Sequence, residues 1–413
     1  MLIQRKDQKG FTAIIVAFLV LLVMFGIAAS LIILSVGQTK IATTLAQSNR
    51  AYYVAEAGIE DILLRLNEGM QYSSPYSFSL EGVTVEVTVS DLSGASKTIT
   101  AEGNSNNRIR KVEVVYELSG SNPGFFYGAQ VGDGGLLMKN RSKVIGNVFS
   151  NGNAKLEGPE SEITNTISVA NVGNKIFGEG KVSENVFADR CEDIRVTGVL
   201  HANNVSGCAY GSLTNSGLPV NPISLPIPDS QIQEWKDDAE VGGIIGSFTR
   251  NSGISYLGPV KIEGNLTIQN TAKLVITGTI LVTGTINMKN SAQVSLDSSY
   301  GSSSGIIIGE SIITLENSST SSGSGSPGSY LMYISTSSAN PAIIIKNFAR
   351  VDILYSNSGW VEINNNTSMK SIYAYGITVQ NEATLKYEIG LANAFFVSGP
   401  SAGWVVKSWR EVL

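Results

Sequence analysis

The chain has few residues of the kinds that build metal and nucleophilic sites. Its 413 residues include two cysteines, Cys191 and Cys208, and one histidine, His201. A zinc site or a cysteine–histidine nucleophile pair would need nearly all of them. We therefore expect no metal, no cofactor and no catalytic residue, and we expect His201 to be a surface or stacking residue.

Charged residues are also scarce. They make up 15 % of the chain, against about 25 % in average proteins. The formal net charge is −5, and the sequence contains no basic stripe. Because a nucleic-acid partner requires clustered lysine and arginine to neutralise phosphates, we expect none. The 43 glycines and many uncharged polar residues instead favour a β-rich fold with a polar, weakly charged surface.

One segment near the N-terminus carries no charge at all. From Phe11 to Val36 there are 26 residues without a formal charge, enough for a helix to cross a hydrocarbon core of about 30 Å. Basic residues outnumber acidic ones before it, which keeps the N-terminus in the cytoplasm and sends the rest outward. A cleaved secretory signal would have a shorter apolar region, of about 7–15 residues. The sequence therefore predicts one retained span over 11–36.

The helical pattern continues beyond this span. Residues 38–66 contain no proline, and apolar residues recur at helical spacing, among them Ile41, Leu45, Ile59 and Ile62. We predict one continuous helix over 11–68, half in lipid and half against an exterior domain. The turn-rich sequence YSSPY at 72–76 follows it.

Three features together resemble the N-terminus of PilX-like type IV minor pilins: KGF at 9–11, the uninterrupted apolar helix, and RAYYVAEAGIEDILLRL at 50–66. The resemblance implies a prepilin-type leader over 1–10, cleavage after Gly10 by a prepilin peptidase, and methylation of Phe11. It also implies that the helix packs with other pilins in a pilus. Major pilins carry a glutamate at the fifth mature position, and Ile15 stands there in this chain. The resemblance is therefore to minor or terminal pilins.

Alternating residues follow the helix. In the stretch 78–89, valines occupy every second position and polar residues the positions between, and the stretches 97–103 and 108–118 repeat this alternation. Such alternation is typical of antiparallel strands with one buried face. We predict a small antiparallel β module over 72–120 whose valine face packs on the exterior half of the helix.

A different pattern recurs from residue 125 onward: apolar, any, Asn, any, small, any, apolar. Clear copies are MKNRSKV, IQNTAKL, MKNSAQV, IKNFARV and VQNEATL, and INNNTSM at 363–369 and LENSSTS at 315–321 are looser copies. The spacing between neighbouring copies matches one coil of a parallel β-solenoid. We assign a turn role to the central asparagines Asn140, Asn270, Asn290, Asn347, Asn365 and Asn381.

The chemistry of this motif fits a solenoid corner. Apolar side chains stack inward, asparagine adopts the left-handed backbone conformation that turns the chain, and a small residue fits the crowded corner. The asparagines could also stack as a hydrogen-bonded ladder, in addition to their turn role. A β-sandwich is the competing fold, but its hairpins would not need a recurrent corner motif. The predicted fold class is α+β, mainly β, with a parallel β-helix over 125–413.

Two segments interrupt the repeats. Residues 218–243 are proline-rich and then helical, and we expect them to cross or cover the solenoid. Residues 318–329 read as a flexible Gly/Ser loop. Trp404 and Trp409 are expected to close the terminal coil. Cys191 and Cys208 are one coil apart, and in an exported protein we expect a disulfide between them.

Together these patterns favour a non-enzymatic structural minor pilin. It would sit in the cytoplasmic membrane, enter a type IV pilus through its helix, and display the β-helix for pilus priming or adhesion. The expected partners are other pilins, the prepilin peptidase and the lipid bilayer, with surface glycans as a further candidate. Two alternatives stay open, a secretion-system pseudopilin and a membrane-anchored β-helix enzyme acting on polysaccharide. For the enzyme, the densest charge cluster is DRCEDIR at 189–195.

Overall fold

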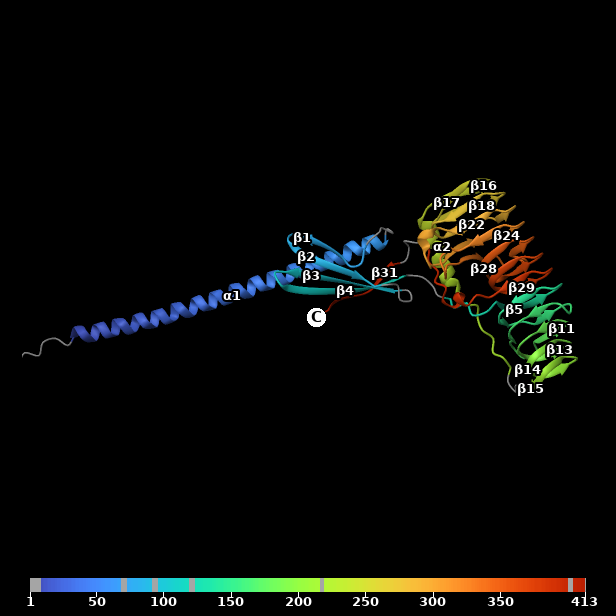
Figure 1. Ribbon diagram of the computed structural model, residues 1–413, viewed down its shortest axis with the longest axis horizontal. Helices are drawn as coiled ribbons and strands as arrows, with labels where there is room; N and C mark the ends of the chain where they lie inside the picture. Colours follow the sequence, from blue (N-terminus) through green and yellow to red (C-terminus); the bar gives the residue numbers. More distant parts are fainter. Residues whose placement is uncertain are drawn as a thin grey trace, which may run out of the picture. The chain divides into compact units, whose positions relative to one another are not determined.

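A computed structural model describes residues 9–67, 73–90, 96–118, 123–215, 219–399 and 404–412. Most of the expected leader, residues 1–8, lies outside them. The chain divides into two compact units, Met1–Glu117 with Val405–Leu413, and Leu118–Trp404. We describe each unit by itself, and Figure 1 shows the elements of both.

The first unit combines one long helix with a small sheet. Helix α1 spans Lys9–Asn67, and the sheet has the order β1-β2-β3-β4-β31. The pairings from β1 to β4 are antiparallel, as the alternation predicted. Its strands are β1 (Tyr76–Leu80), β2 (Val83–Val89), β3 (Ser96–Ser105), β4 (Arg108–Leu118) and β31 (Trp404–Val412).

The C-terminal half of α1 packs on the valine face of this sheet, and two glycines allow the close approach. The helix buries Ala51, Ala55 and Ile59. A Cβ added at Gly103 would lie 2.0 Å from the carbonyl oxygen of Ala51, and one added at Gly58 would lie 2.9 Å from Val87 Cγ2. The glycine of the AEAGIE segment therefore serves packing, because any side chain there would push the sheet away.

The C-terminal strand does not belong to the solenoid, and the prediction that the β-helix continues to residue 413 is wrong. Strand β31 pairs with β4 at the edge of the small sheet. Arg110 Nη1 lies 2.7 Å from Glu411 Oε1, and Arg410 Nε donates to Glu113 Oε1 at 3.1 Å. Trp409 therefore does not close a terminal coil. The alternation in WVVKSWREV predicts a strand but cannot name a partner that lies about 300 residues earlier.

The second unit is a parallel β-solenoid, which confirms the predicted fold class. Its first half contains β5 (Ala129–Met138), β6 (Lys143–Ile145), β7 (Val148–Ser150), β8 (Ala154–Leu156), β9 (Glu162–Ile163), β10 (Ile167–Val169), β11 (Lys175–Gly178), β12 (Lys181–Val182), β13 (Val186–Glu192), β14 (Arg195–Ser206) and β15 (Ala209–Thr214). Every pairing given for these strands is parallel.

The second half of the solenoid follows a helix, α2 (Asp229–Val241). Its strands are β16 (Ile244–Arg250), β17 (Ile254–Leu257), β18 (Val260–Gln269), β19 (Lys273–Ile276), β20 (Ile280–Val282), β21 (Ile286–Lys289), β22 (Gln293–Leu296), β23 (Gly305–Gly309), β24 (Ile313–Glu316), β25 (Thr320–Ser322), β26 (Leu331–Ser335), β27 (Ile343–Lys346), β28 (Arg350–Ile363), β29 (Ser368–Val379) and β30 (Thr384–Lys386). Short 3-10 helices cover Ser298–Tyr300 and Ile389–Asn393.

The coils are not stacked in the order of the chain. Strand β5 pairs with β29 on one side and with β7 and β8 on the other, so the first coil lies in the middle of the solenoid. From there the chain winds to one end at β15. It then starts again at the opposite end with β16 and winds back until β30 pairs with β6 (Figure 1). The sequence repeats did not predict this arrangement, because each coil looks alike.

The first apolar residue of each motif copy forms a continuous stack inside the solenoid. Each member pairs in register with the next, and all are at most 1 % exposed. In spatial order they are Ile268, Met288, Leu315, Ile345, Ile363, Val379 and Met138. This stacking is the physical reason for the apolar position of the repeat.

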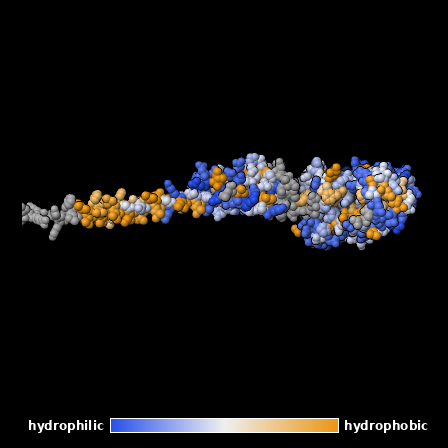
Figure 2. All heavy atoms as spheres, turned by 90° about the horizontal axis from the view of Figure 1, so that it is seen from below, coloured by the Kyte–Doolittle hydropathy of each residue, from blue (hydrophilic) through white to orange (hydrophobic). Residues whose placement is uncertain are grey.

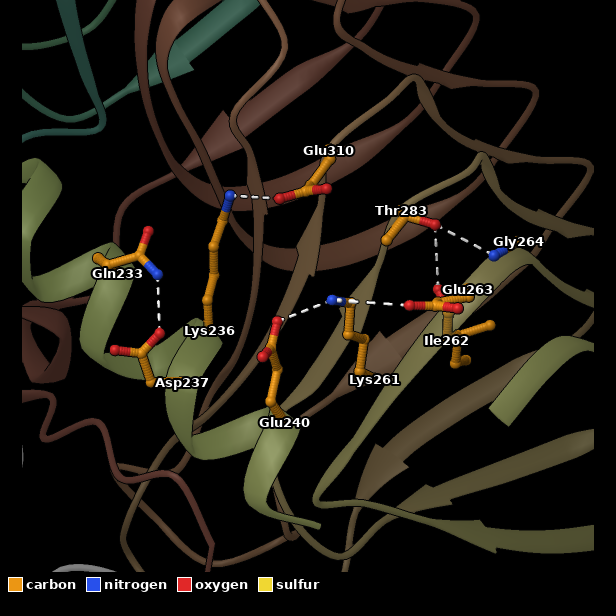
Figure 3. A network of polar contacts seen from close by, with 10 residues as sticks. All are labelled: Gln233, Lys236, Asp237, Glu240, Lys261, Ile262, Glu263, Gly264, Thr283 and Glu310. Atoms are coloured by element: carbon orange, nitrogen blue, oxygen red, sulfur yellow. Dashed lines mark hydrogen bonds and ion pairs between the residues drawn. The ribbon is translucent and has the colours of Figure 1, made fainter. Parts of the chain in front are cut away.

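A second core forms outside the coils, where the segment around α2 covers one sheet. Ile227, Ile232 and Trp235 are buried in one cluster with outward-facing residues of β23, β26 and β28. Ion pairs flank this cluster (Figure 3): Lys236 Nζ lies 2.6 Å from Glu310 Oε1, and Lys261 Nζ lies 2.9 Å from Glu240 Oε1. The described part of this segment, 219–243, thus packs on the surface of the solenoid between its two ends.

The Gly/Ser segment is more ordered than the sequence suggested. Thr320–Ser322 form strand β25, so the prediction of a flexible loop over 318–329 is wrong for its first residues. The hydroxyls of Ser321 and Tyr333 lie 2.9 Å apart in the interior, and Gly323 N donates to Asp352 Oδ2 at 2.9 Å. Ser321 fits this interior position because its hydroxyl has a buried partner.

Candidate functional site

The N-terminal part of α1 presents a long apolar surface. Every described residue from Ala13 to Val20 is exposed, and Phe25 is 73 % exposed. Figure 2 shows hydrophobic residues along this part of the helix. By length and composition, α1 is apolar enough to cross a membrane. An apolar surface of this extent is unfavourable in water, so it requires lipid or other apolar helices around it.

Some hydroxyl side chains of this helix donate hydrogen bonds to carbonyls of the preceding turn. Ser30 Oγ donates to the carbonyl of Gly26 at 2.8 Å, and Thr39 Oγ1 donates to that of Ser35 at 2.9 Å. Such bonds let hydroxyls enter lipid without an unpaired donor. Gly10 and Phe11 lie in the first turn of α1, which begins at Lys9. Their processing stays a prediction.

The asparagine corners lie on one edge of the solenoid. All six predicted residues, together with Asn317, have left-handed φ values between 50° and 60°. In six of these seven corners the next residue is left-handed as well. Asparagine tolerates this conformation better than most residues, which explains its recurrence. A turn role was not predicted for Asn317 because its motif copy, LENSSTS, lacks the final apolar residue.

The same asparagines form a continuous hydrogen-bonded ladder. Each Nδ2 donates to the Oδ1 of the next asparagine, in the spatial order Asn140, Asn381, Asn365, Asn347, Asn317, Asn290 and Asn270. The six distances are 2.8, 3.0, 2.8, 2.9, 3.1 and 3.3 Å. The sequence allowed a turn role with or without a ladder, and in the structure the asparagines have both roles.

Two glycine substitutions separate these roles. Asn365→Gly keeps the left-handed backbone but removes two ladder hydrogen bonds, at 2.8 and 3.0 Å. Each bond contributes about 0.5–1.5 kcal/mol. The neighbouring Asn366 is also left-handed, so Asn366→Gly makes the same change in backbone freedom outside the ladder. We expect Asn365→Gly to unfold at clearly lower urea concentration than Asn366→Gly. Equal midpoints would show that the ladder contributes nothing.

The two cysteines are bonded. Cys191 lies in β13 and Cys208 follows β14, with an S–S distance of 2.07 Å and a Cα–Cα distance of 6.4 Å. The bridge joins successive coils near the β15 end of the solenoid. On the same coils, His201 stacks on Phe187 with ring centroids 4.2 Å apart. His201 is thus a stacking residue.

The DRCEDIR cluster is held by structural hydrogen bonds. Asp189 accepts from Asn203 Nδ2 at 3.0 Å and from Gly173 N at 2.8 Å, and these bonds lower the pKa of its carboxyl. Glu192 lies 2.6 Å from Lys175 Nζ, and that bond lowers the pKa of Glu192. Low pKa values keep both carboxylates ionised, which is the opposite of what a general acid requires.

A second charged group lines a cavity of about 440 Å³ at β28, β29 and β30. Lys370 Nζ lies 3.1 Å from Asp352 Oδ1 and 3.0 Å from Glu388 Oε2. Burial raises the pKa of Asp352, although Lys370 and two backbone N–H donors oppose the shift. One donor, Gly323, belongs to the Gly/Ser segment, and the other, Leu331, begins strand β26 just after it. Asp352 therefore anchors that segment, a role that the sequence did not reveal.

The family match with known proteins lies in the N-terminal helix. Residues 9–60 match the family model described as PilX N-terminal. Among solved structures, the chain is similar to the competence-associated pilin ComZ from Thermus thermophilus. The identity is 10 %, over 89 % of this chain and 97 % of that one, with a TM-score of 0.37. A score of this size does not establish a shared fold. No curated protein sequence matches the chain.

The family match covers the part of α1 that is apolar and exposed and then the part that packs on the small sheet. The AEAGIE segment, with the glycine that allows this packing, lies within the matched residues. Sequence, structure and comparison therefore agree over this region. The N-terminal segment of the chain, residues 9–60, is therefore similar to the N-terminal segment of PilX-like pilins.

Proposed function

We propose that the chain is a minor pilin of a type IV pilus that displays the solenoid outside the cytoplasmic membrane. One observation carries this proposal: α1 is one continuous helix whose exposed apolar half is followed, within the PilX-like segment, by a half that packs on a small sheet. Such a helix can reside in lipid before assembly and among other pilin helices afterwards. The protein then acts as a structural component and not as an enzyme.

Processing follows from the same proposal. A prepilin peptidase would remove the leader after Gly10, and Phe11 would become the methylated N-terminus. Basic residues before the span place the leader in the cytoplasm. The Cys191–Cys208 disulfide is consistent with an oxidising compartment for the solenoid. With Ile15 at the fifth mature position, the chain would be a minor or terminal subunit.

One deletion can distinguish a priming role of the solenoid from an adhesion role. Because β31 belongs to the small sheet, the deletion must keep it, so residues 123–399 are replaced by a short Gly/Ser linker. If pili are lost, the solenoid serves priming. If pili remain but attachment to surfaces is lost, it serves adhesion. Normal piliation together with normal attachment would contradict the proposal that the displayed solenoid has either role.

The alternative of a polysaccharide-active enzyme has one observation in its favour. Asp352 is buried and lies beside Lys370 and Glu388 in a cavity. Lys370, however, stands between the two carboxylates and pairs with both. Polysaccharide turnover by the purified chain, lost in Asp352→Asn but not in the matched Asp189→Asn, would support the enzyme. A pseudopilin would instead be recovered with a secretion system and not with pili.

A further inference from the structure

The residues that follow the ladder asparagines form a line along the solenoid. Phe348 N donates to Asn365 O at 3.0 Å, Asn366 N to Asn381 O at 2.9 Å, and Glu382 N to Asn140 O at 3.0 Å. Successive coils are therefore hydrogen-bonded at this corner, at a spacing of about 4.8 Å. In spatial order the line runs Thr271, Ser291, Ser318, Phe348, Asn366, Glu382 and Arg141.

Phe348 is the exception in this line. It has a φ of 63° and is 60 % exposed. A bulky residue in the left-handed conformation costs about 1–2 kcal/mol, and an aromatic ring normally offsets such a cost by burial. Here the ring has little burial, and the equivalent corners use serine, threonine, asparagine or charged residues. Neither the turn nor the packing requires phenylalanine, and such outliers are typical of binding sites.

A hollow lies next to Phe348 along the same line. It has a volume of about 690 Å³ and is lined by Arg141, Asn366 and Glu382, with the turn 158–160 on its far side. Asn366 is exposed, and no hydrogen bond of its side-chain amide is found within the described ranges of the chain. Arg141 pairs with Glu382, and its Nε lies 3.7 Å from Glu160 Oε2. Exposed ion pairs of this kind contribute little stability, so their polar groups remain available to a ligand.

This combination fits a carbohydrate chain. A sugar ring has an apolar C–H face that packs on an aromatic ring, and a rim of hydroxyls that needs planar donors and acceptors such as amide, carboxylate and guanidinium groups. On the three coils that follow Phe348, the line presents one such polar group each, from Asn366, Glu382 and Arg141. The two carboxylates of Glu160 and Glu382 outnumber the one guanidinium, which disfavours an anionic polymer. A peptide cannot bind here as an added β-strand, because the backbone carbonyls at this corner already accept hydrogen bonds from the next coil.

We propose that Phe348, Asn366, Glu382 and Arg141, which we call the corner track, bind a neutral glycan chain. Phe348 packs on a sugar ring, and the three polar residues bond the hydroxyls of the following units. The proposal rests on the proposed function in one respect, since it supplies a ligand for the adhesion role. Binding itself is measured on the purified protein and does not depend on pilus assembly.

The test uses the full-length protein in a detergent without a sugar headgroup. Its binding is measured against immobilised tetrasaccharides of three kinds: neutral hexose, N-acetylhexosamine and uronic acid. We expect binding to a neutral series, and at least a tenfold loss in Phe348→Ser. Serine stands at the equivalent position in two other corners, so this variant is expected to fold normally. Phe348→Tyr keeps the ring and is expected to keep the binding. Ser318→Ala, one coil away, is the matched control.

Three results would overturn the proposal. These are no binding to either neutral series, unchanged binding in a folded Phe348→Ser variant, and preference for the uronic acid series. If the purified protein instead binds pilin subunits through Phe348 and no saccharide, the corner track is a protein contact. Piliation of cells that carry Phe348→Ser is scored separately and is expected to be normal. Failure of glycan binding therefore leaves the pilin assignment standing, and failure of piliation in the solenoid deletion leaves the glycan site standing.

Discussion

Replacement of Trp235 by alanine is expected to lower the free energy of unfolding of the solenoid unit by about 3–5 kcal/mol. Trp235 is 2 % exposed and lies in the cluster between α2 and the outer face of the solenoid. Its removal leaves a cavity there and weakens the segment that connects β15 with β16. Urea unfolding of the full-length protein in detergent, followed by circular dichroism, measures this loss.

A control on the same helix keeps this test specific. Val241 is 87 % exposed at the end of α2, so Val241→Ala is expected to change stability by less than about 0.5 kcal/mol. Surface ion pairs of α2, such as Lys236 with Glu310, are also expected to contribute little. If Trp235→Ala unfolds at the same urea concentration as Val241→Ala, the packing of α2 does not stabilise the solenoid.

Deletion of residues 1–36 is expected to move the protein completely out of the membrane fraction. This segment contains most of the apolar exposed part of α1, and the helix packs on the small sheet from Ala51 onward. The truncated chain should also stay in the cytoplasm, where thiols are reduced. Cys191 and Cys208, which are bonded in the structure, should then react with an alkylating reagent without prior reduction.

The full-length chain gives the opposite expectation in both measurements. It should need detergent for extraction, and its cysteines should react only after reduction. Leu45→Arg is the matched control, because Leu45 is exposed on α1 beyond the span, and this variant should behave as the full-length chain. A truncated chain that remains in the membrane, or a full-length chain with freely reactive thiols, would contradict the predicted topology.

Local patterns predicted most of the fold. The charge-free run, the alternating valines and the recurrent Asn motif each depend on residues close in sequence, and each produced the expected type of element. The corner asparagines are predictable for the same reason, since a left-handed turn selects Asn wherever it occurs. Asn317 was missed because Ser321, and not an apolar residue, fills the inward position after it, where its hydroxyl lies 2.9 Å from that of Tyr333.

Long-range pairing could not be predicted. The placement of Asn140 beside Asn381, the return of β31 to the small sheet, and the start of the second half at the far end of the solenoid all join residues far apart in sequence. A solenoid accepts any coil next to any other of similar period, so the repeats contain no information on their order. The corner track was missed for a related reason, because Phe348 and Arg141 come together only through this stacking.

The mass of the mature N-terminus tests the pilin account most directly. The protein is isolated from membranes and from sheared pili, digested, and its N-terminal peptide is weighed. The account predicts a chain that begins at Phe11 and carries one added methyl group, in both fractions. An intact chain that begins at Met1 in the membrane fraction, with none in pili, would contradict it and leave only a membrane-anchored solenoid.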